Sequence, residues 1–119
     1  MSTRPQRGDI WQVEFGRPVG NEQGAGLRPA VVISSNGFND SGAGLAIVAP
    51  LTTAQRNYPS RIRIRPGSSG LLETSWAAVE HLRSVSVLRL REYRGTVDDQ
   101  VLDVIDEVLG FLLHRSDRR

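Results

Sequence analysis

The sequence contains no cysteine, and because its fifteen basic residues are all arginine it contains no lysine either. Without cysteine, neither a disulfide framework nor a thiolate metal site can form. The two histidines are too few for a typical metal centre, so we expect no metal and no other cofactor. The longest unbroken apolar run, Leu45 to Leu51, falls far short of the ~18 residues that a membrane-spanning helix needs.

Length and composition indicate one globular domain over residues 1–119, since chains usually divide into domains only beyond ~200 residues. Hydrophobic residues make up 39% of the chain and charged residues 24%, a globular rather than a disordered composition. The amino-terminal residues are polar and lack the apolar core of a signal peptide. We therefore expect a soluble, cytoplasmic protein with no membrane segment.

The net charge of +2 conceals an uneven distribution. Residues 1–97 carry twelve arginines and seven acidic residues, a net charge of +5, whereas residues 98–119 carry three arginines and six acidic residues, a net charge of −3. A codon preference for arginine accounts for the missing lysine, but not for the clustering of Arg56, Arg61, Arg63 and Arg65. Because a guanidinium binds phosphate and carboxylate bidentately, this cluster favours a nucleic acid or an acidic peptide as partner.

Alternating or continuous apolar runs predict about five short strands, over residues 9–15, 29–34, 45–49, 60–65 and 75–80. The third run is ended by Pro50, and the fourth directs Ile62 and Ile64 inward and three arginines outward. Residues 16–28 form a loop that is long for a small domain, which indicates function, and residues 37–44 form a turn. Residues 85–90 fit a strand or a helix equally well.

The last element is predicted to be an amphipathic helix over residues 98–114. Asp98 can cap its amino terminus, and apolar residues recur at helical spacing through Val101, Ile105, Val108 and Leu112. The acidic residues lie off this stripe, on a face that we expect to be solvated. Short strands followed by one helix predict a mainly β fold, a small curled sheet or partly open barrel packed against the helix.

Two residues next to predicted strands could carry chemistry. Arg28 stands between the long loop and the second strand, where it could hold a phosphate or simply form an ion pair with Glu22. Thr52 follows Pro50, and its hydroxyl could donate to a phosphate oxygen or satisfy the backbone of a turn. Glu80 and His81 are adjacent, but neighbouring residues of a strand point to opposite faces, so this pair is not expected to act together.

Several common catalytic motifs are missing. No glycine-rich phosphate loop precedes a helix, and no Gly-x-Ser-x-Gly elbow is present. Hydrolytic chemistry would have to depend on arginine, threonine, carboxylate and groups of the substrate. RNA permits this, because its 2′-hydroxyl can attack the adjacent phosphorus while the protein orients the substrate and stabilises developing charge.

In several blocks the chain resembles the MazF/PemK/Kid toxins. These blocks are Arg7-Gly-Asp-Ile-Trp11, Gly20-Asn-Glu-Gln-Gly24, Arg28-Pro-Ala-Val-Val-Ile33, Asn39, Val48-Ala-Pro-Leu-Thr-Thr53, Tyr58-Pro59, Glu80 to Val85 and the helix that begins with Asp98-Asp-Gln100. They span nearly the whole chain, in order and at the spacing of the family. The resemblance implies an SH3-like barrel of the PemK/CcdB type, a homodimer, and a metal-independent, sequence-specific endoribonuclease that leaves a 2′,3′-cyclic phosphate and a 5′-hydroxyl.

The resemblance also implies a partner and a set of site residues. The partner is a MazE-like antitoxin with an acidic, disordered segment. Arg28 and Thr52 match the catalytic arginine and threonine of the family. Glu22 matches a loop glutamate that is important for activity in some members, and Glu80 matches an acidic position that some members assign to catalysis, so both join the expected catalytic set. We expect contacts with single-stranded RNA from further polar and basic residues: Asn21, Gln23, Thr53, Gln55, Arg56, Arg61, Arg63 and Arg83.

The chain departs from the family pattern at two positions. Asn21 stands where some members have histidine, and Ala78 stands where some have arginine, so a mechanism that needs those groups is not expected here. Two other functions remain open. One is a non-catalytic toxin on the same fold that poisons DNA gyrase. The other is a plain RNA-binding barrel with Arg61, Arg63 and Arg65 as a phosphate track and Trp11 or Trp76 as a stacking platform.

Overall fold

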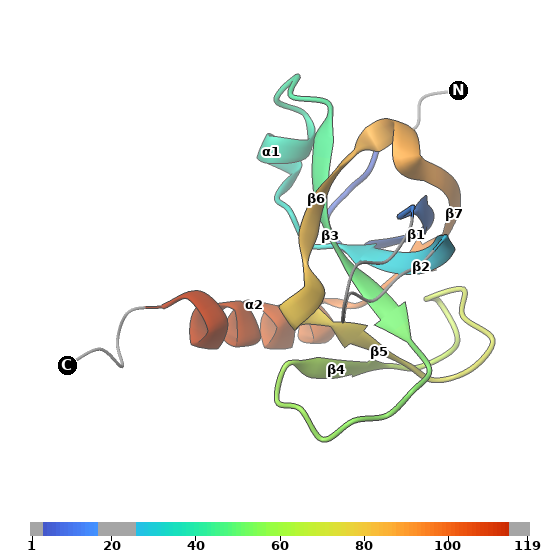
Figure 1. Cartoon of the computed structure of the whole chain (residues 1–119), viewed down its shortest axis with the longest axis vertical. Coiled ribbons are helices and arrows are strands. Elements are labelled where there is room, and N and C mark those ends of the chain that lie inside the picture. Colours follow the sequence, from blue (N-terminus) through green and yellow to red (C-terminus); the bar gives the residue numbers. More distant parts are fainter. Residues whose placement is uncertain (1–3, 17–25, 115–119) are drawn as a thin grey trace.

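The computed structural model describes residues 4–16 and 26–114 (Figure 1). Within these ranges the chain forms seven strands, two helices and two 3-10 turns. In chain order they are β1 (Asp9–Glu14), β2 (Leu27–Val32), α1 (Asn36–Asn39), β3 (Leu45–Thr52), β4 (Arg61–Ile64), β5 (Ser75–Ala78), η1 (Val79–His81), β6 (Arg83–Ser86), η2 (Val87–Arg89), β7 (Leu90–Thr96) and α2 (Asp99–Leu113).

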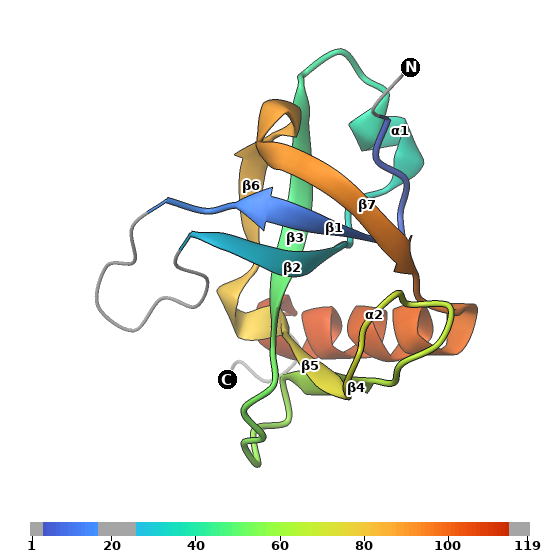
Figure 2. The same cartoon turned by 90° about the vertical axis from the view of Figure 1, so that its right-hand side faces the viewer.

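All strand pairs are antiparallel, and the sheet has the order β4-β5-β3-β2-β1-β7. The eight-residue strand β3 organises it, because β2 pairs along one edge of β3 while β6 and then β5 pair along the other. The strands cross at large angles around β3, and α2 lies across one side of the sheet (Figure 2). The predicted mainly β fold with a carboxy-terminal helix is confirmed. The sheet remains open, and its architecture is consistent with an SH3-like barrel.

Side-chain alternation divides the interior into two cores, one on each face of the sheet. The helix-side core lies between the sheet and α2 and includes Ile10, Val31, Leu51, Ile64 and Ile105. The Trp11 core lies on the opposite face, where the sheet curls over itself, and is built from Trp11, Val13, Phe15, Ala30, Val32, Ala46, Val48, Val85 and Leu90. The predicted common face of Trp11, Val13 and Phe15 is therefore confirmed.

Several predicted strand boundaries are wrong, and two of them bear on the site. Strand β2 begins at Leu27, so Arg28 is part of a strand rather than the end of a loop. Pro50 lies within β3 opposite Ala30 and does not end the strand. Proline is tolerated there because β6 pairs only as far as Val48 and β5 pairs only from Leu51, so the missing N–H falls between the two ladders.

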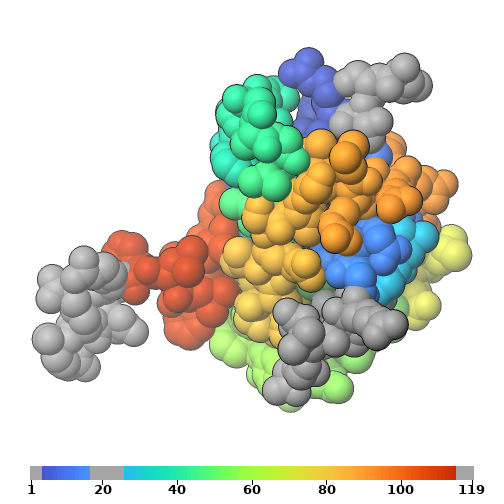
Figure 3. All heavy atoms as spheres, turned by 45° about the horizontal axis from the view of Figure 1, so that its top comes forward, coloured from blue at the N-terminus to red at the C-terminus, as the bar shows by residue number. Residues whose placement is uncertain are grey.

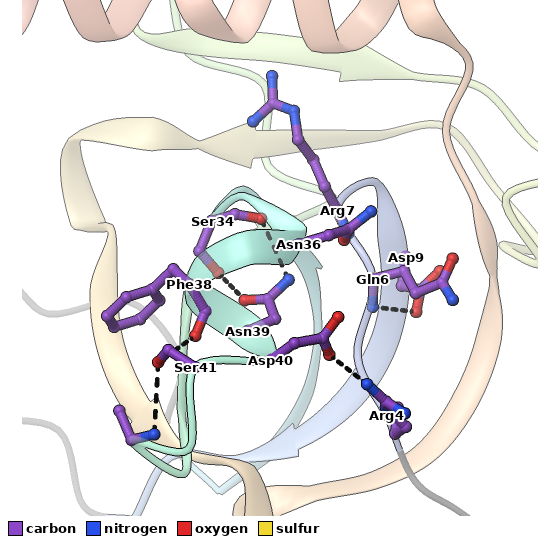
Figure 4. Close-up of polar contacts among 11 residues, drawn as sticks. Arg4, Gln6, Arg7, Asp9, Ser34, Asn36, Phe38, Asn39, Asp40 and Ser41 are labelled. Carbon is purple, nitrogen blue, oxygen red and sulfur yellow. Dashed lines mark hydrogen bonds and ion pairs between the residues drawn. The ribbon is translucent and has the colours of Figure 1, made fainter.

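A short helix, α1, occupies part of the predicted turn between β2 and β3 (Figure 4). The Ser35 hydroxyl caps it by accepting a hydrogen bond from the Phe38 N–H at 3.2 Å. Behind the cap, the buried Ser34 hydroxyl donates to the Asn39 side chain and accepts from the Ile47 N–H at 2.9 Å. These bonds satisfy polar groups that would otherwise destabilise the interior, which explains why Ser34 and Asn39 are buried.

Helix α2 matches the prediction closely. The Asp98 carboxylate accepts a hydrogen bond from the Val101 N–H at 3.0 Å, and Ile105 is fully buried in the helix-side core. The expectation that its acidic face is only solvated is wrong for Asp106, whose two oxygens accept hydrogen bonds from Arg7 at 2.8 Å. The carboxy-terminal end of α2 projects from the body of the molecule (Figures 1 and 3). Among the described residues, no helix is both long and apolar enough to cross a membrane.

Candidate functional site

The register of the sheet brings Arg28 and Thr52 together. Strands β2 and β3 pair Val32 with Val48 and Ala30 with Pro50, where their ladder ends. Arg28 and Thr52 each lie two residues beyond this last pair, Arg28 where β2 pairs with β1 and Thr52 where β3 pairs with β5. Both side chains belong to the face of the Trp11 core, since they follow Ala30 and Val48 at even spacing. The Arg28 guanidinium confirms the proximity: it donates to the Leu51 carbonyl oxygen at 3.2 Å.

Arg28 is half-buried, and its hydrogen bond to Leu51 fixes the guanidinium at the end of β3. A guanidinium has five N–H donors, so one bond to a carbonyl leaves donors for an anion. The alternative role, an ion pair with Glu22, falls outside the described residues, as do the expected RNA-binding residues Asn21 and Gln23. Of the predicted site, the structure therefore describes the part on β2 and β3.

Thr52 is only 7% exposed, and its Oγ1 accepts a hydrogen bond from the Ala54 N–H at 3.1 Å. This contact closes the turn after β3, as one of the two sequence interpretations expected. The contact uses the hydroxyl only as an acceptor, so its proton remains for donation to another oxygen. The structural role and the proposed contact to phosphate are therefore compatible.

The row that starts with Arg28 and Thr52 continues across the sheet. Trp76 of β5 pairs with Thr52, and Arg63 of β4 pairs with Trp76. Residues directly opposite one another in antiparallel strands share a face, so Thr52, Trp76 and Arg63 form one transverse row, and Arg28 reaches its Thr52 end through the hydrogen bond to Leu51. Arg63 is exposed and Trp76 is half-buried. This row offers cations for phosphate and an aromatic ring for a base.

Trp76 was not among the residues expected in the site; it was named only as a stacking platform in the alternative of a plain RNA-binding barrel. No local pattern could place it beside Thr52, because the pairing of β3 with β5 joins residues 24 positions apart. The other proposed platform, Trp11, is 7% exposed in the Trp11 core, and its indole N–H donates to Asp9 at 3.2 Å. The interpretation of Trp11 as a stacking surface is therefore wrong.

Other predicted RNA-binding residues lie around the row. Arg83 is the first residue of β6 and pairs with Val48, which places it on the face of the Trp11 core, and its guanidinium carbon lies 5.5 Å from the centre of the Phe15 ring. Thr53, Gln55 and Arg56 are exposed in the segment that joins β3 to β4. Arg83 thus shares a face with the row, and the segment continues directly from Thr52.

Arg61 departs from the prediction. It was expected to project into solvent with Arg63 and Arg65, but its side chain is only 4% exposed. The guanidinium donates to the Glu80 carboxylate through both Nε and Nη2 at 2.6 Å and lies 4.9 Å from the centre of the Tyr58 ring. Glu80 is 19 positions further along the chain, so the alternation within the strand contained no sign of this partner and predicted an exposed Arg61.

Glu80 lies in η1 rather than in a strand, so the argument from opposite strand faces does not apply to Glu80 and His81. The nearest Glu80 oxygen is 3.8 Å from His81 Nε2. The other oxygen accepts a hydrogen bond from Ser60 at 2.6 Å. Partial burial by itself would raise the pKa of the Glu80 carboxyl. Hydrogen bonds from Ser60, from its own N–H and from Arg61 outweigh that effect and lower the pKa.

These contacts limit what Glu80 can do chemically. A carboxylate with a lowered pKa and several strong donors is a weak proton acceptor, so it is better suited to hold Arg61 and Ser60 in place than to act as a general base. The described part of the chain has no group of three or more acidic or histidine side chains that could together hold a metal ion. The Arg28 guanidinium and the Thr52 hydroxyl, which follows the Leu51 carbonyl that Arg28 binds, are therefore the groups best suited to chemistry at this site.

Comparison with known proteins places this site in a family. A sequence model for the PemK-like, MazF-like toxins of type II toxin–antitoxin systems matches residues 6–113. The chain belongs to the PemK/MazF toxin family. Endoribonuclease MazF9 of Mycobacterium tuberculosis is 33% identical over 109 residues, covering 87% of this chain and 92% of that protein.

Solved structures of this family have the same architecture. The crystal structure of MazF from Deinococcus radiodurans superposes with a TM-score of 0.75 at 29% identity, covering 92% of this chain and 94% of that one. A chain of a MazE–MazF crystal structure from the same organism gives a TM-score of 0.75 at 30% identity, with coverages of 95% and 98%. The sheet and the terminal helix are thus features that this chain shares with MazF proteins.

Proposed function

We propose that this chain is a sequence-specific endoribonuclease toxin that cuts single-stranded RNA, mRNA above all, without a metal ion. Membership of the PemK/MazF family and the 33% identity to a protein named endoribonuclease support this proposal. The observation that carries it is the position of Arg28, whose guanidinium binds the carbonyl oxygen of Leu51, the residue before Thr52. The cytoplasm is the compartment that we propose, because a toxin of this kind must meet RNA there.

The reaction needs charge stabilisation more than it needs a cofactor. The 2′-oxygen of the substrate attacks the adjacent phosphorus and loses its proton, and the 5′-oxygen leaves and gains one. The products are a 2′,3′-cyclic phosphate and a 5′-hydroxyl. Negative charge increases on the non-bridging oxygens, where the Arg28 guanidinium supplies charge and directed donors and Thr52 adds a neutral hydrogen bond. Arg28 remains protonated at neutral pH, so its role is stabilisation of the transition state rather than proton transfer.

The remaining residues of the row bind the substrate. Arg63 is exposed and can contact a neighbouring phosphate, while Trp76 offers a ring for base stacking between the two arginines. Arg83 extends the basic surface along β6. Glu80 and Arg61 act as positioning residues: their ion pair joins η1 to the start of β4 and so holds the row in register.

A set of matched variants at Arg28 and Thr52 tests the proposal. Thr52→Ser keeps the hydroxyl, whereas Thr52→Val keeps the shape and removes the donor. Arg28→Lys keeps the charge and removes the planar fork. At saturating RNA we expect Thr52→Val to lower the cleavage rate by ~10²–10³ and Arg28→Lys by at least as much, since each loses a preorganised donor, while Thr52→Ser stays within about tenfold of wild type. Near-native turnover of folded Arg28→Lys would refute the assignment.

The chemistry of the ends tests the reaction class. Cleavage should continue in excess EDTA and should leave 5′-hydroxyl ends that polynucleotide kinase labels directly. Activity that is lost on chelation and recovered with a divalent cation would refute the metal-independent mechanism. Retention of intact RNA by the protein would favour the plain RNA-binding barrel, and inhibition of DNA gyrase without any RNA cleavage would favour the non-catalytic toxin.

We further propose that the chain forms a homodimer and binds a MazE-like antitoxin through an acidic, disordered segment. The exposed apolar residues on the projecting end of α2, Phe111 at 67% and Leu113 at 70%, are suited to an interface. The basic first part of the chain suits an acidic partner, and a MazF relative has been crystallised with MazE. A sedimentation mass of one chain at micromolar concentration, or antitoxin binding that does not change with ionic strength, would contradict these two proposals respectively.

A further inference from the structure

A groove of about 470 Å³ lies between strand β4 and the first two turns of α2, and we call it the β4–α2 groove. Neither Arg28 nor Thr52 lines it. Its volume is within the range of about 300–1,000 Å³ that is typical of sites for small organic ligands. The groove is therefore large enough for such a ligand, and the side chains that line it decide the chemical class.

Apolar side chains from two elements line the β4–α2 groove. Ile62 and Ile64 contribute from β4, and Val101 and Val104 contribute from α2. Both isoleucines belong to the helix-side core, where close packing fixes their positions. The turn after β4 closes one end, and a main-chain hydrogen bond of 3.0 Å ties that turn to β7. A fixed apolar surface of this kind favours a ligand with a flat ring, which leaves water when it binds.

The charged side chains beside the groove are mainly cationic. Arg63 and Arg65 are both exposed and line it from β4. The acidic residue that lines it, Asp98, is already engaged, because its carboxylate accepts the Val101 N–H at 3.0 Å as the cap of α2. A guanidinium binds carboxylate or phosphate and also stacks on aromatic rings. The groove is therefore complementary to an aromatic ring that carries an anionic group.

Arg63 connects the β4–α2 groove with the transverse row of the candidate site. Arg63 pairs with Trp76, and alternation along β4 places its side chain on the face opposite Ile62. Strand β4 is an edge of the sheet, since among the described residues it pairs only with β5 (Figure 2). The long side chain of Arg63 can therefore reach over the row or around this edge to the groove. A guanidinium that holds an anion in the groove is not available to a phosphate beside Trp76.

We propose that the β4–α2 groove is a regulatory site for a small aromatic anion, whose binding weakens the binding of RNA. The ring packs between the apolar side chains of β4 and α2, and the anionic group contacts Arg63 and Arg65. Bound anion keeps Arg63 away from the row, so the affinity for RNA falls while the chemistry at Arg28 and Thr52 is unchanged. The effect on RNA rests on the proposed function of the row, whereas binding of the anion does not.

The first test measures binding without RNA, with 2-naphthoate as the probe. The control is 2-naphthol, which has the same two rings and no carboxylate. Calorimetry measures affinity, and NMR amide shifts locate the site. We expect shifts at residues 62–65 and 100–104, and at least about tenfold weaker binding of 2-naphthol. A parallel titration with adenosine monophosphate compares the two sources of such an anion: tighter binding would identify a nucleotide as the natural ligand, and weaker binding an aromatic acid.

Three variants test the walls of the groove. Arg65→Gln removes one cation and should weaken 2-naphthoate binding by about threefold to tenfold. Arg91→Gln on β7, where the arginine is also exposed, is the matched control and should change the affinity by less than about twofold. Val104 is 40% exposed on the helix side, so Val104→Trp should fill the groove without disturbing the core and should abolish binding.

The second test measures RNA cleavage in the presence of the probe. Saturating 2-naphthoate should raise the KM for RNA to that of the Arg63→Ala variant, with kcat unchanged, and should have no further effect on that variant. Val104→Trp should cut RNA at the wild-type rate and should not respond to 2-naphthoate.

Equal affinities for 2-naphthoate and 2-naphthol, amide shifts away from the groove, or full binding by Val104→Trp would each overturn the proposed site. Binding in the groove that leaves the KM for RNA unchanged would overturn its regulatory role. A chain that binds 2-naphthoate in the groove but does not cut RNA contradicts the proposed activity and not the site, because the binding test contains no RNA.

Discussion

The ion pair between Arg61 and Glu80 allows a sharp prediction about stability. Replacing Arg61 with methionine keeps most of the apolar stem of the side chain and removes the guanidinium. Glu80 then keeps its hydrogen bond from Ser60 but loses both Arg61 donors, each of which now lies at 2.6 Å. The cation also leaves the face of the Tyr58 ring. The Arg61→Met variant therefore leaves the partly buried Glu80 carboxylate with fewer hydrogen-bond donors.

The magnitude follows from the burial of the two groups. Breaking a fully buried ion pair costs ~3–5 kcal/mol, and a hydrogen bond to a charged group contributes ~1.5–3 kcal/mol. The Arg61 side chain is 4% exposed but Glu80 is 24% exposed, so water can partly replace the lost donors. We expect Arg61→Met to lower the free energy of unfolding by about 2–4 kcal/mol. At roughly 4 °C per kcal/mol for a domain of this size, the melting temperature should fall by about 8–16 °C.

The pH dependence has a definite sign. The pKa of Glu80 is lowered in the folded protein, so the pair contributes its full stability above the unfolded pKa of glutamate, ~4.3, and loses it as the pH falls through the folded pKa. The difference in unfolding free energy between wild type and Arg61→Met should thus be largest at neutral pH. It should shrink below about pH 4, where the carboxyl becomes protonated.

Urea denaturation followed by circular dichroism at several pH values measures this difference. Arg63→Met is the matched control, because Arg63 lies two residues along the same strand and is exposed, and we expect a change within about 0.5 kcal/mol. If Arg61→Met and Arg63→Met have equal effects, or if the Arg61 effect is unchanged at low pH, the ion pair is not the stabilising interaction described here.

Three further predictions concern the scaffold. A Cβ at Gly95 would lie 2.3 Å from the Ser68 carbonyl oxygen, so Gly95→Ala should destabilise the fold by about 1–3 kcal/mol. A Cβ at Gly110 in α2 would meet no atom within 4 Å, so Gly110→Ala should stabilise the fold by up to about 1 kcal/mol. Thermal melts of both variants check the opposite signs. Asp98→Ala removes the cap of α2 and should cost about 1 kcal/mol, which Asp98→Ser should largely restore in the same assay. Asp106→Ala should cost at most about 1 kcal/mol and less at high salt, because its bonds to Arg7 are exposed; a loss that does not change with salt would contradict an electrostatic origin.

Local patterns in the sequence were sufficient for the elements that depend on local physics. The helical spacing of Val101, Ile105 and Val108 and the capping residue Asp98 predicted α2 almost to its ends, since periodicity and capping are properties of neighbouring residues. Alternation likewise predicted the common face of Trp11, Val13 and Phe15. The family blocks identified four catalytic candidates, Arg28, Thr52, Glu22 and Glu80, of which Glu22 lies outside the described residues.

Predictions failed where the outcome depended on a partner distant in the sequence. Pro50 continues β3 because of where the β6 and β5 ladders end, and Arg61 is buried because Glu80 comes to lie beside it. No pattern within either strand contains that information. From the local sequence, a proline is expected to end a strand, and an arginine on the polar side of an alternating strand is expected to be exposed. Pairing with segments distant in the sequence changes both outcomes.

The candidate site shows the same division. The residue types of Arg28 and Thr52 could be read from the sequence, and so could their places near the ends of predicted strands. The contact of Arg28 with Leu51 beside Thr52, and the extension of the row to Trp76 and Arg63, depend on the registers of three strand pairs. A shift of one residue in any of these registers would turn the side chains to opposite faces. Only the folded sheet sets those registers, because they depend on how both cores pack at once.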